Sequence, residues 1–259
     1  MTKIGCCLPL LSTLAIFCTP DLSAWDRIGL EPSHDNTLYE TAIDQGDQKI
    51  EVSNGAGSFL FAGRTGLDAG YKRRRALLRF DLASSLPPDT EIVFAELSLY
   101  QSKSAPGSPP AVMGLHRVLQ SWGEGESNAV GPEGQGNPAE AGDATWHHSH
   151  YPDELWEAEG GNYQEAASAV ATVGQELRRY VWTCNESLLE DLRTWRDNPE
   201  LNFGWILVGG EAAGFSAHRF SSRENSTQEN RPILTITYKK SDAIWADGFE
   251  PVAHCSGAN

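Results

Sequence analysis

The sequence has little positive charge. Its 20 Lys and Arg residues stand against 35 Asp and Glu residues, a formal net charge of −15. This balance argues against a general nucleic-acid binder, because an acidic surface repels phosphates. Beyond residue 24 no apolar run approaches the roughly 20 residues that span a bilayer, so we expect no membrane span. Methionine is also scarce, with two residues against eight Trp, which indicates a core filled with rigid side chains.

The first 24 residues have the pattern of a secretory signal peptide. Lys3 precedes an apolar stretch over residues 4–18, and Leu22-Ser23-Ala24 resembles a signal peptidase site before Trp25. A buried N-terminal helix is the alternative, but Pro20 would stop it. We therefore expect the protein to be secreted, extracellular or at the cell surface, after removal of residues 1–24.

Cysteine is sparse after the leader. Three of the five cysteines lie in residues 1–24, which leaves Cys184 and Cys255. Two thiols in an oxidising compartment predict one disulfide, closing a loop of about 70 residues. The alternative is that Cys184 is a small buried apolar residue and Cys255 belongs to a loose tail.

The residues after the leader alternate between apolar and polar with the period of β-strands. Candidate strands cover residues 59–61, 76–80, 94–100, 112–118, 177–182, 203–208, 215–220 and 233–238. One segment differs, because Leu188, Leu189, Leu192 and Trp195 have helical spacing. Thr183 and Glu186 predict a capping box for this helix, and Asn198-Pro199 predicts its end.

Many short strands and one short helix predict an all-β fold, an antiparallel β-sandwich of jelly-roll type, over residues 28–239. Residues 240–259 are expected to form a tail outside it. Residues 123–163 contain eight Gly and three Pro without sustained alternation. We expect this long segment, here called the excursion, to fold down on the surface and to carry function or variability.

Five blocks of sequence occur in order along the chain: DNTLYE at 35–40, RRALLRFDL at 74–82, GDATW at 142–146, NFGWIL at 202–207 and FSSREN at 220–225, followed by Arg231-Pro232. Together these blocks resemble the DNRLRE family of secreted bacterial domains. That family is similar to disaggregatase-related repeats and to alginate-binding carbohydrate-binding modules. The resemblance implies a β-sandwich exported to the cell surface or its polysaccharide matrix, and it implies sugar binding without naming a reaction. The tail sequence IWADGFE at 244–250 resembles a short terminal motif of exported bacterial proteins.

Motifs for nucleophilic catalysis are missing. There is no Gly-x-Ser-x-Gly sequence, and neither Cys184 nor Cys255 has a recognisable partner histidine. A group of carboxylates around Trp156 could act on glycosidic bonds, but a solvated acidic face explains it better in so acidic a chain. The group consists of Asp153, Glu154, Glu157 and Glu159.

Metal-like spacing occurs at one place, the His147-His148-x-His150 sequence. On a strand His148 and His150 would share a face, yet only these two converge easily, so no metal site is predicted there. A structural calcium ion is left open, with no other cofactor expected, because carboxylates often fix the loops of sandwich modules. The candidate residues are Asp35, Asn36, Asp81 and Asp143.

A basic stripe is the most informative feature. Strand period places Arg73, Arg75, Leu77 and Arg79 on one face. The opposite, inward face takes Ala76, Leu78 and Phe80. Three arginines facing solvent on an acidic protein predict recognition of an anionic ligand such as a uronate-containing glycan. The alternative is that they pair with local acids, for instance Glu96.

Aromatic side chains complete the predicted site. Tyr100, Trp146 and Trp156 have polar neighbours and are predicted to stack on sugar rings, whereas Trp182, Trp195 and Trp205 are assigned to the core. Together these features predict a non-catalytic module that binds an acidic polysaccharide. The alternatives are a structural or adhesive surface domain and a polysaccharide lyase or glycosidase.

Overall fold

A computed structural model of the chain describes residues 25–240, except 41, 46–47 and 88, together with Cys255. The predicted signal peptide and nearly all of the predicted tail therefore lie outside the described residues. Within the described part no helix is long and apolar enough to cross a membrane.

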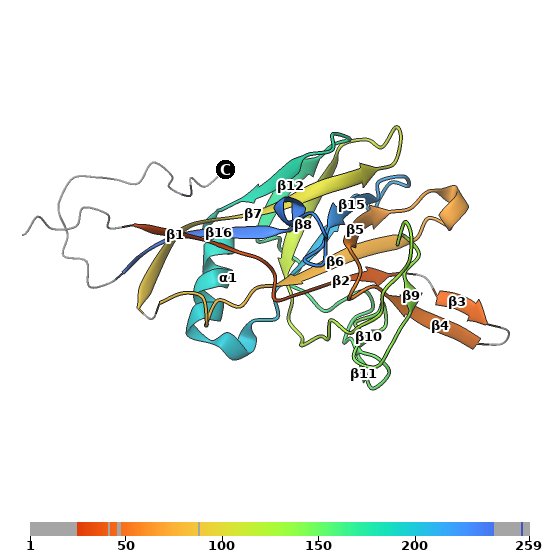
Figure 1. The fold of residues 1–259 in the computed structure, drawn as a ribbon, viewed down its shortest axis with the longest axis horizontal. Coiled ribbons are helices and arrows are strands. Elements are labelled where there is room, and N and C mark those ends of the chain that lie inside the picture. The colour runs from red at the N-terminus through yellow and green to blue at the C-terminus, as the bar shows by residue number, and fades with distance from the viewer. Residues whose placement is uncertain (1–24, 41, 46–47, 88, 241–254, 256–259) are drawn as a thin grey trace, which may run out of the picture.

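The protein is an all-β sandwich of jelly-roll type, made from one large curled antiparallel sheet, as predicted (Figure 1). Two layers of this sheet face each other, and two further strands connect them. The first layer consists of β1 (Asp26–Leu30), β7 (Thr90–Ser104), β13 (Arg179–Thr183) and β16 (Ile233–Lys240). The second consists of β2 (His34–Tyr39), β6 (Arg73–Arg79), β8 (Ala111–Arg117), β12 (Ala169–Val173) and β14 (Trp205–Gly209). The connecting strands are β5 (Phe59–Arg64) and β15 (His218–Ser221).

The main core lies between the two layers and follows from the alternation of the strands. Ala76 and Leu78 of β6 face Leu97 and Leu99 of β7 across this core, and all four side chains are fully buried. Trp182, Trp195 and Trp205 belong to the same cluster, which confirms their assignment from the sequence.

The α-helix found among the described residues closes one end of the core. α1 (Glu186–Asp197) buries Leu188, Leu189, Leu192 and Trp195, the residues that predicted it. The predicted capping box is wrong, because Asn185 is the N-cap residue and its side chain accepts a hydrogen bond from the Leu188 amide. Figure 1 shows α1 at one end of the sandwich and the hairpin of β3 (Ala42–Gln45) and β4 (Gln48–Ser53) at the other.

Some strands have no clear signal in the sequence. β2 and β12 were not predicted from periodicity, yet β2 pairs with β6 along six residues and β12 pairs with β8 along five. β2 is buried at five of its six positions, so it lacks the alternation of apolar and polar residues that indicates a half-exposed strand. Phe215 was assigned to a strand, but its backbone is left-handed, with φ of 62°.

The excursion folds onto the outer face of the second layer, where it forms a second core. Its short strands are β9 (Asn137–Pro138), β10 (His148–His150) and β11 (Glu154–Leu155). This second core consists of Leu38, Leu77, Val118, Trp122, Ala144, Trp146, Trp156 and Ile206. The prediction that residues 123–163 fold down on the sandwich is confirmed, and the outer face of β6 is consequently covered.

The predicted disulfide is present between Cys184 and Cys255, whose Cα atoms lie 5.5 Å apart. It joins the residue just before the α1 cap to the last described residue of the chain. The alternative of two separate thiols is therefore not what the structure shows.

Candidate functional site

The predicted basic stripe occupies the expected face of β6 but does not meet solvent. Leu77 lies in the second core while Ala76 and Leu78 lie in the main core, so the assignment of faces is confirmed. The expectation that this face is open is wrong, because the excursion covers it. The role of the stripe in ligand binding stays a prediction, and the contacts of each arginine indicate a structural role.

Arg75 is the most enclosed of the predicted ligand-binding arginines, with 6% of its surface exposed. Its guanidinium donates to both carboxylate oxygens of Glu211, at 2.7 and 2.9 Å, and to the Gly160 carbonyl at 2.7 Å. The guanidinium carbon also lies 4.9 Å from the centre of the Trp146 ring. Arg75 thus ties the excursion and the loop after β14 to the sheet.

Arg73 and Arg79 are half-buried. The Arg73 guanidinium carbon lies 4.7 Å from the centre of the Trp146 ring. The Arg73 side chain also forms a bidentate ion pair with Glu40. These hydrogen bonds lower the pKa of Glu40 to about 2. Arg79 lies 5.5 Å from the centre of the Trp122 ring. The partner proposed from the sequence, Glu96, instead faces Arg27.

The predicted stacking residues do not offer open ring faces. Trp146 and Trp156 are 2% and 6% exposed and belong to the second core, so the expectation that they face solvent is wrong. Polar neighbours in the sequence do not indicate exposure here, because Thr145 beside Trp146 is itself fully buried, whereas Glu157 beside the buried Trp156 is exposed. Tyr100 is half-buried on β7 opposite Arg179, in the other layer from β6. The predicted residues therefore do not form one surface.

An exposed pair of aromatic rings lies elsewhere, on two loops. Tyr71 comes from the loop between β5 and β6, Phe215 comes from the loop between β14 and β15, and their side chains are 39% and 48% exposed. The ring centres are 6.3 Å apart and the ring planes are nearly perpendicular, at 88°. We call Tyr71 and Phe215 the aromatic corner.

Glycines support both rings of the aromatic corner. A Cβ atom on Gly66 would lie 2.3 Å from the Phe215 ring, and one on Gly214 would lie 2.5 Å from the Tyr71 ring. Each ring therefore packs directly on backbone that has no side chain. Tyr71 and Phe215 are also themselves left-handed, with φ of 54° and 62°, a conformation that costs about 1–2 kcal/mol for a residue with a Cβ.

Arg64 joins the two loops that carry the aromatic corner. Its Nε donates to the Tyr71 carbonyl at 2.7 Å, and its Nη1 donates to the Glu211 carbonyl at 3.1 Å. The Phe215 amide adds a hydrogen bond to the Thr65 carbonyl. The aromatic corner is thus held in place while its rings stay accessible, and Lys72, next to Tyr71, is exposed.

A cluster of acidic side chains lies at the far end of β6. Carboxylate oxygens of Asp35, Glu124 and Glu224 all lie within 4.8 Å of one another. Asp35 is on β2 opposite Leu78, Glu124 is in the excursion, and Glu224 follows β15. We call these three residues the carboxylate cluster.

The carboxylate cluster is enclosed and only partly neutralised. Asp35 is 1% exposed, and its Oδ1 and the Oε2 of Glu224 have no hydrogen-bond partner. Arg223 donates from its side chain to Glu124 at 2.8 and 3.1 Å and from its amide to Asp35 Oδ2 at 2.8 Å. Burial, with the Glu224 charge second, raises the pKa of Asp35 well above its usual range, and burial raises that of Glu224.

The other residues considered for calcium are not among the carboxylates that converge in the carboxylate cluster. Asn36 binds Ser53 and the Glu124 carbonyl through its amide group. Asp143 accepts from the Glu140 amide at 2.7 Å. Asp81 accepts from the side chain and amide of Ser84, which lowers its pKa. Of the four candidates only Asp35 belongs to the cluster.

The histidine sequence does not converge on one point. His147 contacts Glu51 at 2.9 Å, and His150 contacts Glu154 at 3.1 Å. His148 packs edge-on against Tyr151. The three histidines therefore have separate partners. The acids at 153, 154, 157 and 159 are exposed, as a solvated face requires.

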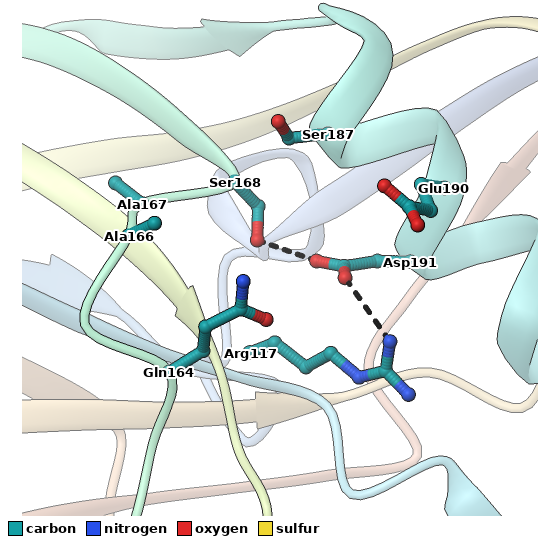
Figure 2. A pocket seen from close by; sticks show the side chains of 8 residues that line it. All are labelled: Arg117, Gln164, Ala166, Ala167, Ser168, Ser187, Glu190 and Asp191. Carbon is teal, nitrogen blue, oxygen red and sulfur yellow. Dashed lines mark hydrogen bonds and ion pairs between the residues drawn. The ribbon is translucent and has the colours of Figure 1, made fainter.

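A small polar hollow of about 90 Å³ lies between α1 and the loop before β12 (Figure 2). Ser168 donates to Asp191 at 2.5 Å, Trp205 Nε1 donates to the same oxygen at 2.8 Å, and Arg117 lies 3.7 Å from the other. Burial raises the pKa of Asp191. The volume of the hollow is well below the roughly 300 Å³ of ordinary ligand sites. We therefore interpret Asp191 as a structural residue whose hydrogen bonds hold α1 against the sheet.

Sequence reasoning missed both the aromatic corner and the carboxylate cluster. Tyr71 and Phe215 are 144 positions apart by their numbers, and Asp35, Glu124 and Glu224 are similarly dispersed. No local spacing links them. The glycines beside the two aromatic residues were the available signal for the corner.

Comparison with known proteins adds no identity. No family model matches the sequence, and no curated protein matches it.

Proposed function

We propose that this protein is an exported, non-catalytic module that binds a polysaccharide through the aromatic corner of Tyr71 and Phe215. The observation that carries the proposal is the exposure of two aromatic rings that the surrounding loops hold in fixed positions. Left-handed backbone at both residues is strain that the fold sustains, and such strain clusters at functional positions. The resemblance to DNRLRE domains and their sugar-binding relatives supports the same class of function.

Perpendicular rings suit a sugar unit. A pyranose presents an apolar face of C–H groups, which can lie on one ring while its edge meets the other. Because the rings are already ordered, binding costs little side-chain entropy. A ring that buries about 60 Å² of apolar surface contributes roughly 1.5 kcal/mol, which corresponds to about tenfold in Kd.

The charges beside the aromatic corner favour an anionic glycan. Lys72 is exposed next to Tyr71, and the Arg64 guanidinium lies between the two loops. A uronate carboxylate near Lys72 would gain an exposed ion pair, which contributes roughly 0.2–1 kcal/mol. Aromatic contact therefore supplies most of the affinity, and the charge supplies preference among glycans.

Electrophoresis through gels that contain alginate tests the proposal. We expect Tyr71→Ala and Phe215→Ala each to reduce retention, with an apparent Kd about tenfold higher. The melting temperature should stay nearly unchanged, because both rings are exposed. Lys72→Gln should weaken retention on alginate and not on a neutral glucan. Leu155→Ala is the matched control, since Leu155 is also exposed, at 63%, and lies on β11 of the excursion.

A variant that moves a ring without deleting it sharpens the test. Gly214→Ala would place a Cβ against the Tyr71 ring and should reduce retention although both aromatic side chains remain. Unchanged retention in folded Tyr71→Ala and Phe215→Ala proteins would show that the aromatic corner is not the binding site.

A further inference from the structure

The carboxylate cluster has the composition of a cation site. Its three carboxylates come from β2, the excursion and the turn after β15, so they meet only in the folded protein. Among the described residues, the guanidinium bonded to Glu124 and Glu224 is that of Arg223, whose backbone amide donates to Asp35. With all three acids ionised, the cluster and Arg223 together carry two negative charges.

The independent sign of a ligand is the buried oxygen of Asp35. A buried carboxylate oxygen without a partner loses its hydration and gains nothing in return. Asp35 is 1% exposed, its Oδ1 is unpartnered, and the unpartnered Oε2 of Glu224 belongs to the same cluster. Asp35 Oδ1 and Glu224 Oε2 thus lie in one cluster without a donor, and either a cation or a shared proton would satisfy them.

We propose that Asp35, Glu124 and Glu224 bind one calcium ion that fastens the excursion and the turn after β15 to β2. Carboxylate oxygens are the ligands that hard divalent cations take. Calcium binds oxygen at 2.3–2.6 Å, so its ligands can be up to about 4.6–5.2 Å apart, which accommodates the 4.8 Å limit of the cluster. Water completes the six to eight ligands that calcium takes.

The charged groups around the cluster are compatible with this ion. Arg79 lies near Glu124 and is stacked on Trp122. His34, beside Asp35 on β2, packs edge-on against Trp122. The site is independent of the aromatic corner, because Asp35 pairs with Leu78 at one end of β6 and Tyr71 precedes the other end.

Thermal unfolding of the purified protein, first stripped with a chelator, tests this proposal. Calcium at 100 times its Kd should raise the melting temperature by roughly 5–11 °C for a domain of this size, in a saturable way and with a stoichiometry of one by calorimetry. Magnesium at the same concentration should give a smaller shift. Terbium should bind in place of calcium and luminesce on excitation of Trp122, two residues before Glu124.

Isosteric variants separate the cluster from other acids. Glu224→Gln, at a partly exposed position, should fold and lose calcium affinity at least tenfold, and Asp35→Asn should lose the calcium response as well. Asp153→Asn, at an exposed acid, should behave like the parent protein. A melting temperature that does not change with calcium would overturn the proposal and indicate instead that the carboxylates share a proton. An equal response to magnesium, or an undiminished calcium response in Glu224→Gln, would also overturn it.

Discussion

The replacement of Arg75 by alanine distinguishes a binding arginine from a structural one. Arg75→Ala removes two hydrogen bonds to Glu211, one to the Gly160 carbonyl and the contact with Trp146. The side chains of Arg75 and Glu211 are 7% and 19% exposed, so the substitution leaves a carboxylate largely buried without its partner. Breaking such a pair costs about 3–5 kcal/mol. At 2–4 °C per kcal/mol, we expect the melting temperature to fall by roughly 6–20 °C.

Urea unfolding of Arg75→Ala, Glu211→Gln and the double variant measures this cost and the coupling between the two residues. The double variant should be less destabilised than the sum of the single variants, because removing both charges leaves neither unpaired. Arg79→Ala is the control on the same strand face, and the loss of its contact with Trp122 should cost about 1 kcal/mol. If Arg75→Ala unfolds like the parent protein but is no longer retained by alginate, the structural interpretation is wrong and the sequence-based one is right.

Three further substitutions test features of the fold by urea unfolding. Burial lowers the pKa of His218 from 6.5 to about 4, so the folded protein keeps this imidazole neutral. The free energy of unfolding should therefore fall by up to about 3 kcal/mol as the pH drops from 6.5 to 4. A His218→Gln variant that keeps the full loss would contradict this. Cys255→Ser opens the disulfide to Cys184 and should cost about 2–4 kcal/mol, a loss that a reducing agent should reproduce in the parent protein. Asp191→Asn weakens the hydrogen bonds that hold α1 against the sheet and should cost about 1–3 kcal/mol. An unchanged urea midpoint would refute this structural role of Asp191.

The strand assignments show how far periodicity reaches. It placed Leu77 and the arginines of β6 on one face and Ala76 and Leu78 on the other, because alternation is a local property of the backbone. It could not show what covers each face. The cover comes from Trp146 and its neighbours in the excursion, a segment without period whose position depends on contacts distant in sequence. An outward face was therefore taken for a solvated one.

The candidate sites depend even more on long-range structure. The carboxylate cluster combines Asp35, which was considered from the sequence, with Glu124 and Glu224, which were not. The aromatic corner requires left-handed backbone at Tyr71 and Phe215, a conformation that neither residue type indicates. The disulfide could be predicted from the sequence, because only two cysteines follow residue 24 and the pairing needed no geometry.

The pairing of the edge strand β1 with β16 bears on how the domain responds to force. β1 runs antiparallel to β16, with Asp26 opposite Tyr238 and Leu30 opposite Leu234. Tension between residues 26 and 240 therefore loads the hydrogen bonds one after another from the open end, so little force is needed to peel β1 away. Tension applied beyond Cys255 instead passes through the disulfide to Cys184. In that geometry β16 stays out of the load path, and anchoring on the far side of Cys255 protects the last strand of the sandwich from being pulled out.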